Sequence, residues 1–314
     1  MTIHIAFKER FPSYIERLQK DFIVHDLNLP LERLPADVAS KVEVLVTSGS
    51  AGASRAEIAS LPALKLICTV GTGYESIDLE AARQRGIPVT HAAGINAPVV
   101  ADHAIALLLA GVRDVPAGDA LARSGGWREG LTSRPMLAGK RLGVMGFGGI
   151  GQGIARRAAG FDMKVSYYSR SAKDFPGATR LPTPVALAEA VDFLICALPG
   201  DDSTFHLIGT EVFAALGPAG FFVNVGRGST VDTEAMVAAL RTGTIAGAGL
   251  DVFENEPGAP EALRGLANVV MTPHVGGSAP EAQALSAELI IRNIRGWFDA
   301  RRLESPVPEM RDMA

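Results

Sequence analysis

The chain has 314 residues, of which 47% are hydrophobic and 20% charged, and its formal net charge is −4. At about 150 residues per domain, this length predicts two domains that can each bury a core. The 34 glycines and 19 prolines are spread without a period, which excludes a collagen-like or low-complexity chain. The slight acidic excess and the lack of charge runs disfavour a nucleic-acid partner.

Cysteine usage and the apolar runs indicate where the protein works. Cys68 and Cys196 lie in apolar segments, so we expect reduced core residues and a cytoplasmic location. The first residues pass directly into a strand-like pattern and do not resemble a signal peptide. The longest apolar stretch, 104–112, is too short to span a bilayer. We therefore expect a soluble protein without a membrane partner.

The first hundred residues alternate short β-like runs with amphipathic segments, as in a parallel sheet covered on both faces. The predicted strands are 3–7, 22–26, 42–47, 64–70 and 88–91, with helices over 14–20, 55–61 and 79–85. Residues 99–112 then predict a long helix with almost no polar face. Such a helix is expected to be buried against another domain or a partner subunit.

A second alternating series follows a polar, glycine-rich stretch at 124–130. Its predicted strands are 141–145, 164–168, 191–197, 220–225, 247–252 and 268–272, its helices 150–161, 211–216 and 233–241, and a final helix covers about 280–299. Asp232 is predicted to cap the helix that follows it. The predicted fold class is therefore α/β with two doubly wound parallel sheets, of which the second suits a nucleotide.

The segment 146–151, GFGGIG, matches the pattern G-x-G-x-x-G between an apolar strand and a helix. In this position Gly146 permits a tight turn, Gly148 lets the backbone approach a pyrophosphate, and Gly151 lets the helix pack on the strand. The free amides at the helix N-terminus attract the anion. The context therefore predicts a dinucleotide site rather than an ordinary glycine-rich turn.

The end of the next strand indicates which dinucleotide is bound. An NAD-binding fold normally carries an acidic residue there for the ribose 2′-hydroxyl. This chain has Ser169, Arg170 and Ser171 instead. A guanidinium flanked by hydroxyls suits a 2′-phosphate, so NADP (NADPH) is the predicted cofactor. The alternative is that Arg170 is only a solvated loop residue.

Three titratable residues follow the last strands. Arg227 stands in NVGRG, Glu256 in GLDVFENEP and His274 in TPHVGG. Carboxyl ends of parallel strands are where doubly wound sheets bind ligands, so the three are predicted to be catalytic. Taken singly, each could instead be a structural residue or part of a surface ion pair. No zinc-binding pattern such as H-E-x-x-H or C-x-x-C occurs, and no metal is predicted.

Taken in order, GFGGIG, NVGRG, AGLDVFENEP and TPHVGG resemble the D-isomer-specific 2-hydroxyacid dehydrogenase family. The stretches VGTGYESID at 70–78 and NAPVVADHAIALLLA extend the resemblance over most of the chain. The segments SRS and SPV make it most similar to the NADPH-using glyoxylate, hydroxypyruvate and hydroxyphenylpyruvate reductases. The resemblance thus implies reduction of a small 2-oxo acid such as hydroxypyruvate or glyoxylate.

The resemblance also implies a role for each site residue. Arg227 would bind the substrate carboxylate, His274 would be the general acid, and Glu256 would raise the pKa of His274. Further substrate contacts are implied for Ser48, Val70, Gly71 and Thr72. Further cofactor contacts are implied for Gly149, Ile150, Leu198, Pro199, Val225, Asp251 and Gly276. The remaining histidines are interpreted as surface or packing residues: His4, His25, His91, His103 and His206.

Finally, the resemblance implies a domain arrangement. A Rossmann cofactor domain, 96–274, would be inserted in a flavodoxin-like substrate domain formed by 1–95 and 275–314, with the active cleft between them. The helix at 99–112 and an arm that carries Trp127 would build a homodimer. Two alternatives stay open: an NAD-linked dehydrogenase that works toward oxidation, and a non-catalytic, nucleotide-sensing interaction protein of the same fold.

Overall fold

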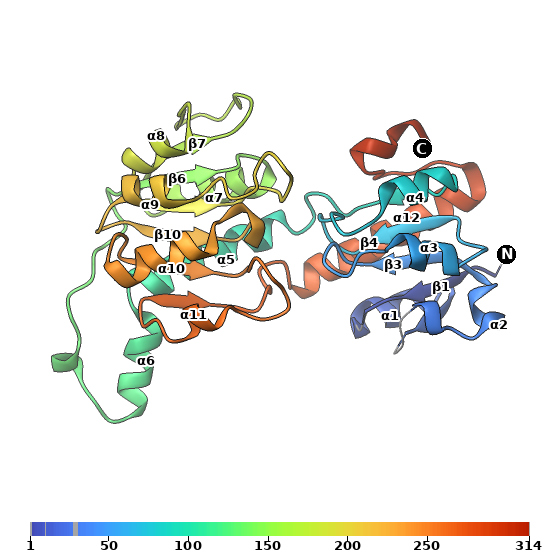
Figure 1. Cartoon of the computed structure of the whole chain (residues 1–314), viewed down its shortest axis with the longest axis horizontal. Helices are drawn as coiled ribbons and strands as arrows, with labels where there is room; N and C mark the ends of the chain where they lie inside the picture. The colour runs from blue at the N-terminus through green and yellow to red at the C-terminus, as the bar shows by residue number, and fades with distance from the viewer. Residues whose placement is uncertain (1, 10, 28–30, 314) are drawn as a thin grey trace. The chain divides into compact units, whose positions relative to one another are not determined.

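The structure is a computed structural model that describes residues 2–9, 11–27 and 31–313 (Figure 1). The chain divides into two compact units, Met1–Asn96 with Ser278–Ala314, and Ala97–Gly277. Each unit contains one sheet, and all pairs of named strands are parallel. The predicted α/β class with two parallel sheets is therefore confirmed.

The first unit holds a five-stranded sheet in the order β2-β1-β3-β4-β5, which is the flavodoxin-like order. Its strands are β1 (His4–Phe7), β2 (Ile23–Asp26), β3 (Val42–Thr47), β4 (Leu66–Thr69) and β5 (Val89–Thr90). Each strand begins or ends within two residues of its predicted position, because its apolar run is bounded by polar residues, glycine or proline.

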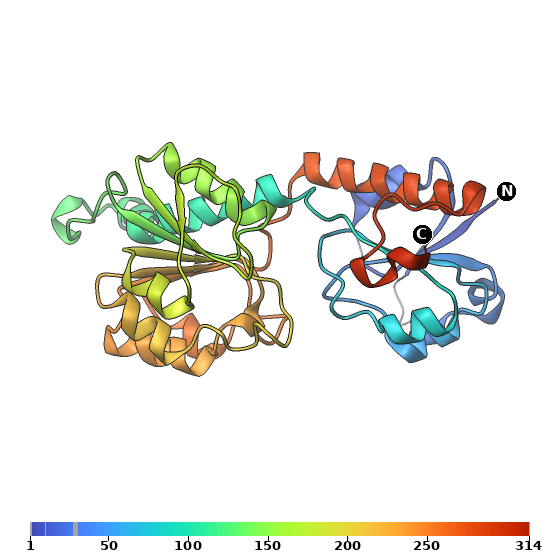
Figure 2. The same cartoon turned by 90° about the horizontal axis from the view of Figure 1, so that it is seen from above.

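Helices cover both faces of this sheet (Figure 2). Ile5 and Val44 face α1 (Pro12–Leu18) and α12 (Pro280–Ala300), whereas Ala6 and Leu45 face the opposite side, as alternation along a strand requires. The opposite side is covered by α2 (Ala36–Ala39), α3 (Arg55–Ser60), α4 (Leu79–Gln84) and the 3-10 helix η4 (Pro308–Met313), and a further 3-10 turn, η1 (Leu31–Arg33), lies nearby.

The second unit holds a seven-stranded sheet in the order β12-β11-β10-β9-β6-β7-β8. Its strands are β6 (Arg141–Met145), β7 (Lys164–Tyr168), β8 (Ala178–Arg180), β9 (Phe193–Cys196), β10 (Phe221–Asn224), β11 (Gly247–Leu250) and β12 (Val269–Met271). The first strand of the unit, β6, lies inside the sheet between β9 and β7, and the strand order reverses between β6 and β9. This reversal is the switch point at which doubly wound folds bind their ligands.

The helices of this unit also form two layers (Figure 2). One face carries α5 (Ala97–Val112) and α7 (Gly149–Ala159), and the other carries α8 (Pro184–Glu189), α9 (Thr210–Leu216) and α10 (Thr233–Thr242). Two short pieces, η3 (Gly228–Thr230) and α11 (Glu261–Arg264), lie between strands. The Asp232 side chain accepts a hydrogen bond from the amide of Ala235, which confirms the predicted cap of α10.

The apolar composition of α5 has a cause inside its own unit. The helix packs against α7 and against strands β10 and β11. Its contact with α7 is close, since a Cβ on Gly153 would lie 2.9 Å from the Cβ of Ala101. The helix is thus covered by neighbours in the same unit, and its lack of a polar face does not by itself indicate a partner subunit.

Several elements lie where no helix or strand was predicted, among them α2, α8, α11 and the following three. Helix α6 (Val115–Arg123) and the 3-10 turn η2 (Arg128–Gly130) form an arm that projects from the second unit (Figure 1). Strand β8 has three residues and pairs only with β7.

Cys68 and Cys196 are buried and free, as expected. Within the described residues, no helix has both the length and the apolar character needed to cross a bilayer.

Candidate active site

The glycine-rich loop between β6 and α7, residues 146–151, is called the glycine-rich cradle here. It is tightly packed at Gly146 and Gly151 and has open space at Gly148. Gly146 has φ +87°, and a Cβ there would lie 2.6 Å from the carbonyl oxygen of Ala197. A Cβ on Gly151 would lie 2.1 Å from the carbonyl oxygen of Gly146, whereas one on Gly148 would meet nothing within 4 Å. Gly148 is the N-cap of α7 and offers no side chain to the first amides of the helix. The loop therefore fits a pyrophosphate group.

The loop after β7 carries the serines and the arginine predicted to contact a 2′-phosphate. Ser169 is buried, and its hydroxyl donates a hydrogen bond of 2.7 Å to the carbonyl oxygen of Ser171. Arg170 and Ser171 are exposed. The hydrogen bond from Ser203 and, more weakly, the charge of Arg170 lower the pKa of Asp201, so this carboxylate lies within electrostatic range of the guanidinium. Ser169 thus shapes the turn, and Arg170 is the exposed cation.

The three residues predicted to be catalytic follow three neighbouring strands of the sheet. Arg227 follows β10, Glu256 follows β11 and His274 follows β12. His274 Nδ1 lies 2.6 Å from Glu256 Oε2, and the other carboxylate oxygen accepts a hydrogen bond from the amide of Phe253. The charge of Arg227 acts on both His274 and Glu256. The structure therefore brings the three side chains together within one unit.

Their electrostatics favour a charged imidazolium. The hydrogen bond to Glu256 raises the pKa of His274, against the opposing effects of burial and of the Arg227 charge. Burial works to raise the pKa of Glu256, but the hydrogen bonds from His274 and Phe253 outweigh it and hold this pKa below its ordinary value. The pair therefore consists of a carboxylate and a histidine that keeps its proton to higher pH than a free imidazole.

The backbone holds His274 in an uncommon conformation. His274 has φ +54°, a left-handed value that costs a non-glycine residue on the order of 1 kcal/mol or more. Its amide donates a hydrogen bond of 2.8 Å to the carbonyl oxygen of Asp251, which fixes the loop on the end of β11. The imidazole is therefore aimed by its loop as well as by Glu256.

The Asp251 carboxylate fastens the same loop. It accepts hydrogen bonds from the Thr272 hydroxyl at 2.6 Å and from the amides of Val275 and Gly276 at 2.9 and 2.8 Å. Burial would raise the pKa of Asp251, but these bonds and the one from His103 lower it to about 2. The sequence pattern indicated a cofactor contact at Asp251 and Gly276; the bonds formed here are those of a loop anchor, and the cofactor contact stays a prediction.

Two of the histidines interpreted as surface or packing residues have polar partners next to the candidate site. His103 Nε2, on α5, lies 2.9 Å from the Thr272 hydroxyl. His206 Nε2 lies 2.6 Å from Glu254, two residues before the Glu256 carboxylate. Both side chains are partly exposed, which agrees with that interpretation, and these contacts add a structural role to it. A single sequence does not reveal these contacts, because each histidine lies far along the chain from its partner.

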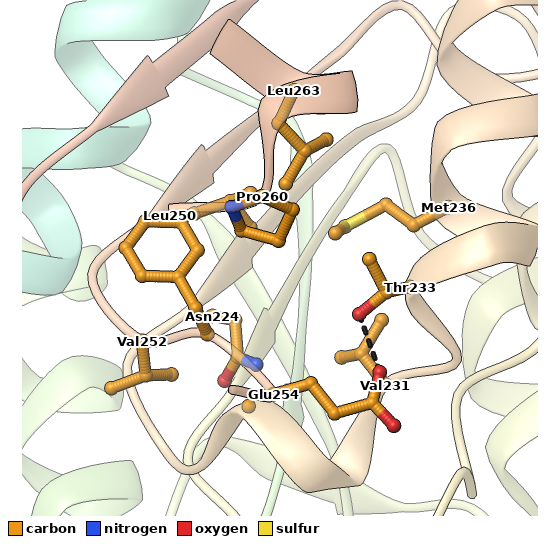
Figure 3. Close-up of a pocket in the computed structure, with 11 residues that line it drawn as sticks. Asn224, Val231, Thr233, Met236, Leu250, Val252, Glu254, Pro260 and Leu263 are labelled. Atoms are coloured by element: carbon orange, nitrogen blue, oxygen red, sulfur yellow. Dashed lines mark hydrogen bonds between the residues drawn. The ribbon is translucent and has the colours of Figure 1, made fainter. Parts of the chain in front are cut away.

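A small pocket lies beside the end of β10, where Asn224 is one of its lining residues (Figure 3). Its lining is mostly apolar, and Glu254 accepts a hydrogen bond of 2.7 Å from Thr233 at its edge. Gly228 also lines it, and a Cβ on Gly228 would lie 1.9 Å from the carbonyl carbon of Phe253. This glycine lets the Arg227 loop approach the loop that leads to Glu256. None of the three predicted catalytic residues lines the pocket.

The other predicted cofactor positions occupy the same edge of the sheet. Leu198 and Val225 are buried behind the ends of β9 and β10, and Pro199 is exposed. Gly149 and Ile150 form the first turn of α7. These positions surround the switch point between β6 and β9, where a dinucleotide is expected.

The predicted substrate contacts of the first unit follow adjacent strands. Ser48 comes directly after β3, and its hydroxyl accepts a hydrogen bond from the amide of Ala51. After β4, the Val70 carbonyl accepts a hydrogen bond of 2.6 Å from Ser286 of α12. A Cβ on Gly71 would meet nothing within 4 Å, and the Thr72 hydroxyl donates to Asn96. Substrate binding by these residues stays a prediction.

Comparison with known proteins bears directly on this site. Residues 105–276 match the family model described as D-isomer specific 2-hydroxyacid dehydrogenase, NAD binding domain. The chain belongs to the D-isomer-specific 2-hydroxyacid dehydrogenase family. As a member of this family it is an oxidoreductase with a dinucleotide-binding domain, and the matched residues lie within the second unit.

This 2-hydroxyacid dehydrogenase is similar to several reductases. It is 42% identical to a glyoxylate reductase of Pyrococcus furiosus over 89% of this chain and 87% of the relative. It is 40% identical to a hydroxyphenylpyruvate reductase of Plectranthus scutellarioides over 86% of each chain. Among solved structures, it resembles an NADPH-dependent glyoxylate/hydroxypyruvate reductase from Sinorhizobium meliloti in complex with NADP and malonate. The two are 37% identical, with a TM-score of 0.90 over 98% of each chain.

Proposed function

We propose that this dehydrogenase reduces small 2-oxo acids, hydroxypyruvate or glyoxylate, to D-2-hydroxy acids with NADPH. The observation that carries the proposal is the His274–Glu256 pair beside Arg227, at the sheet edge that also bears the glycine-rich cradle. The names of the similar reductases and the NADP bound to one of them support the substrate class and the cofactor.

In this reaction Arg227 and His274 act on the substrate, and Glu256 acts through His274. Arg227 binds the carboxylate with two parallel N–H···O bonds and stabilises the negative charge that develops on the carbonyl oxygen. His274 donates a proton to that oxygen, which becomes the hydroxyl of the product. Glu256 holds the ring through Nδ1 and stabilises the imidazolium before transfer, so that Nε2 is the proton donor.

The glycine-rich cradle and the loop after β7 would hold the cofactor. The first amides of α7 would bind the pyrophosphate at Gly148, and Arg170 would bind the 2′-phosphate. When bound, NADPH supplies the hydride that the carbonyl carbon accepts. The proton donor, His274, and the residue that binds the substrate carboxylate, Arg227, both belong to this chain.

A spectrophotometric panel tests the proposal. Hydroxypyruvate, glyoxylate, pyruvate and an aryl 2-oxo acid are each assayed with NADPH and with NADH, and kcat/KM is measured for every pair. We expect the highest values with NADPH and either hydroxypyruvate or glyoxylate. A higher kcat/KM with NADH would overturn the cofactor assignment, and no turnover with any pair would favour a nucleotide-sensing protein.

The Glu256→Gln substitution should change the pH dependence of reduction. Reduction needs protonated His274, so kcat/KM falls as the pH rises through the pKa of this residue. Because Glu256 raises that pKa, its removal should move the fall to lower pH. The measurement is kcat/KM for hydroxypyruvate between pH 5 and 9. Glu254→Gln, which removes the carboxylate paired with His206, is the matched control. It should leave unchanged the pH at which kcat/KM falls.

The projecting arm supports a homodimer. Its exposed apolar side chains are Val115, Trp127, Leu131 and Met136, with 56%, 73%, 44% and 64% of their surface accessible. Clusters of exposed apolar residues commonly mark protein interfaces. We expect the protein to sediment at twice the mass of one chain, and W127S/L131S/M136S to sediment as a monomer. Leu285→Ser, at a leucine of α12 that is 59% exposed, should leave the mass unchanged. A monomeric wild-type protein would contradict this proposal.

A further inference from the structure

The exposed end of β8 carries an arginine that the proposed reaction does not use. Arg180 is the last residue of β8 and lies opposite Tyr167 in the register with β7. Its Nε and Nη2 donate hydrogen bonds of 3.1 and 2.9 Å to the carbonyl oxygen of Ser169, and Nη2 also donates to that of Arg170 at 3.1 Å. One guanidinium thus holds two successive carbonyl groups of the loop after β7.

This contact sets the direction of two amides. The peptide bonds after Ser169 and Arg170 are trans, and in a trans peptide the carbonyl and the following N–H point in opposite directions. With both carbonyl groups turned toward Arg180, the N–H groups of Arg170 and Ser171 point away from it. Within residues 2–9, 11–27 and 31–313, neither amide donates to another group. Successive amides with a shared direction form an anion-binding concavity.

Aromatic packing fixes the rest of the loop. The Tyr167 hydroxyl accepts a hydrogen bond of 2.9 Å from the amide of Lys173 and donates one of 3.2 Å to its carbonyl oxygen. The Tyr167 ring stacks on Phe147 at 3.9 Å, and Phe147 meets Phe175 edge to face. Phe147 is itself part of the glycine-rich loop. The glycine-rich loop and the loop after β7 therefore share one aromatic cluster. Arg180 adds hydrogen bonds to the backbone of the loop after β7.

We propose that Arg180 is a positioning residue for cofactor selection, which orders the loop so that the amides of Arg170 and Ser171 and the Arg170 side chain bind the ribose 2′-phosphate of NADPH. This inference rests on the proposed cofactor preference and adds to it the device that prepares the site before binding. The positive charge of Arg170 acts on the Asp201 carboxylate, whose negative charge would otherwise oppose a phosphate.

Equilibrium binding of two nucleotide fragments separates this role from a general structural one. Calorimetry with the full chain measures adenosine 2′,5′-bisphosphate and 5′-AMP, which differ only in the 2′-phosphate. We expect Arg180→Gln to weaken the bisphosphate at least about tenfold while 5′-AMP changes less than about twofold. Arg180→Lys keeps the charge but not the planar fork, so it should restore less than half of the loss in log Kd. Unchanged 5′-AMP binding shows that each variant is folded.

Controls separate failure of this inference from failure of the cofactor assignment. Arg170→Gln removes the proposed direct ligand and should weaken only the bisphosphate, and Arg241→Gln removes an exposed charge at the end of α10 and should weaken neither fragment. If the wild-type protein binds both fragments equally, the NADPH assignment itself fails. If it prefers the bisphosphate and Arg180→Gln preserves that preference, the role of Arg180 alone is overturned. Full rescue by Arg180→Lys would reduce the role to charge and overturn the bridging mechanism.

Discussion

His274→Ala should lower kcat for reduction of hydroxypyruvate at least about a hundredfold and leave the Kd for NADPH within about twofold of the wild-type value. The reason is that the substitution removes the proton donor, whereas the glycine-rich cradle and the loop after β7 stay intact. Rapid-mixing absorbance at 340 nm measures the chemical step, and fluorescence titration measures cofactor binding.

The matched control for this variant is His206→Gln. His206 and His274 each lie 2.6 Å from a glutamate, and the two glutamates are two residues apart. If the loss in His274→Ala came from disturbing these loops, His206→Gln would lose a comparable amount. We expect it to lose less than about tenfold, because no proton transfer passes through it. A loss below tenfold in His274→Ala would remove this residue from the acid–base role.

Arg227→Gln should lower kcat/KM for the 2-oxo acid by about a hundredfold to a thousandfold, with the KM for NADPH unchanged. The residue both binds the carboxylate and stabilises charge on the carbonyl oxygen, so kcat should fall while KM for the substrate rises. Arg227→Lys should recover only part of the loss, since an ammonium cannot form two parallel bonds to a carboxylate.

Arg156→Gln is the charge-matched control for Arg227, because Arg156 is an exposed cation near the end of α7. Its kinetics should equal those of the wild-type enzyme. If Arg227→Gln raised the KM for NADPH as strongly as that for the 2-oxo acid, the residue would belong to the cofactor site instead.

Most of the fold could be predicted because each buried parallel strand is a short apolar run. The β3 segment matches its prediction at both ends, since four of the six residues of Val42–Thr47 are apolar and the segment is bounded by Lys41 and Ser48. Strand β8 was missed because it has three residues, of which two are exposed, and so leaves no periodicity. Helix α6 was missed because Pro116 and Gly118 weaken its helical pattern.

Prediction of the site was limited by contacts between distant segments. The positions of Arg227, Glu256 and His274 after successive strands indicated a shared edge, and the structure places them there. The contacts that hold the loop of His274 in place were not predictable, because His103 lies on α5, far along the chain from its partner Thr272. In the same way, Arg180 reaches the carbonyl oxygen of Ser169 because it lies on β8, a strand that the sequence did not indicate.

One consequence follows from the fact that Arg227, Glu256 and His274 all belong to the second unit. The mutual geometry of His274, Glu256 and Arg227 is set by neighbouring strands of a single sheet and does not depend on the position of the other unit. In the proposed reaction, the loops after β3 and β4 would therefore be free to change in evolution without disturbing proton transfer. With the substrate contacts predicted for the first unit, exchanging that unit between relatives would change the substrate range and leave proton transfer intact.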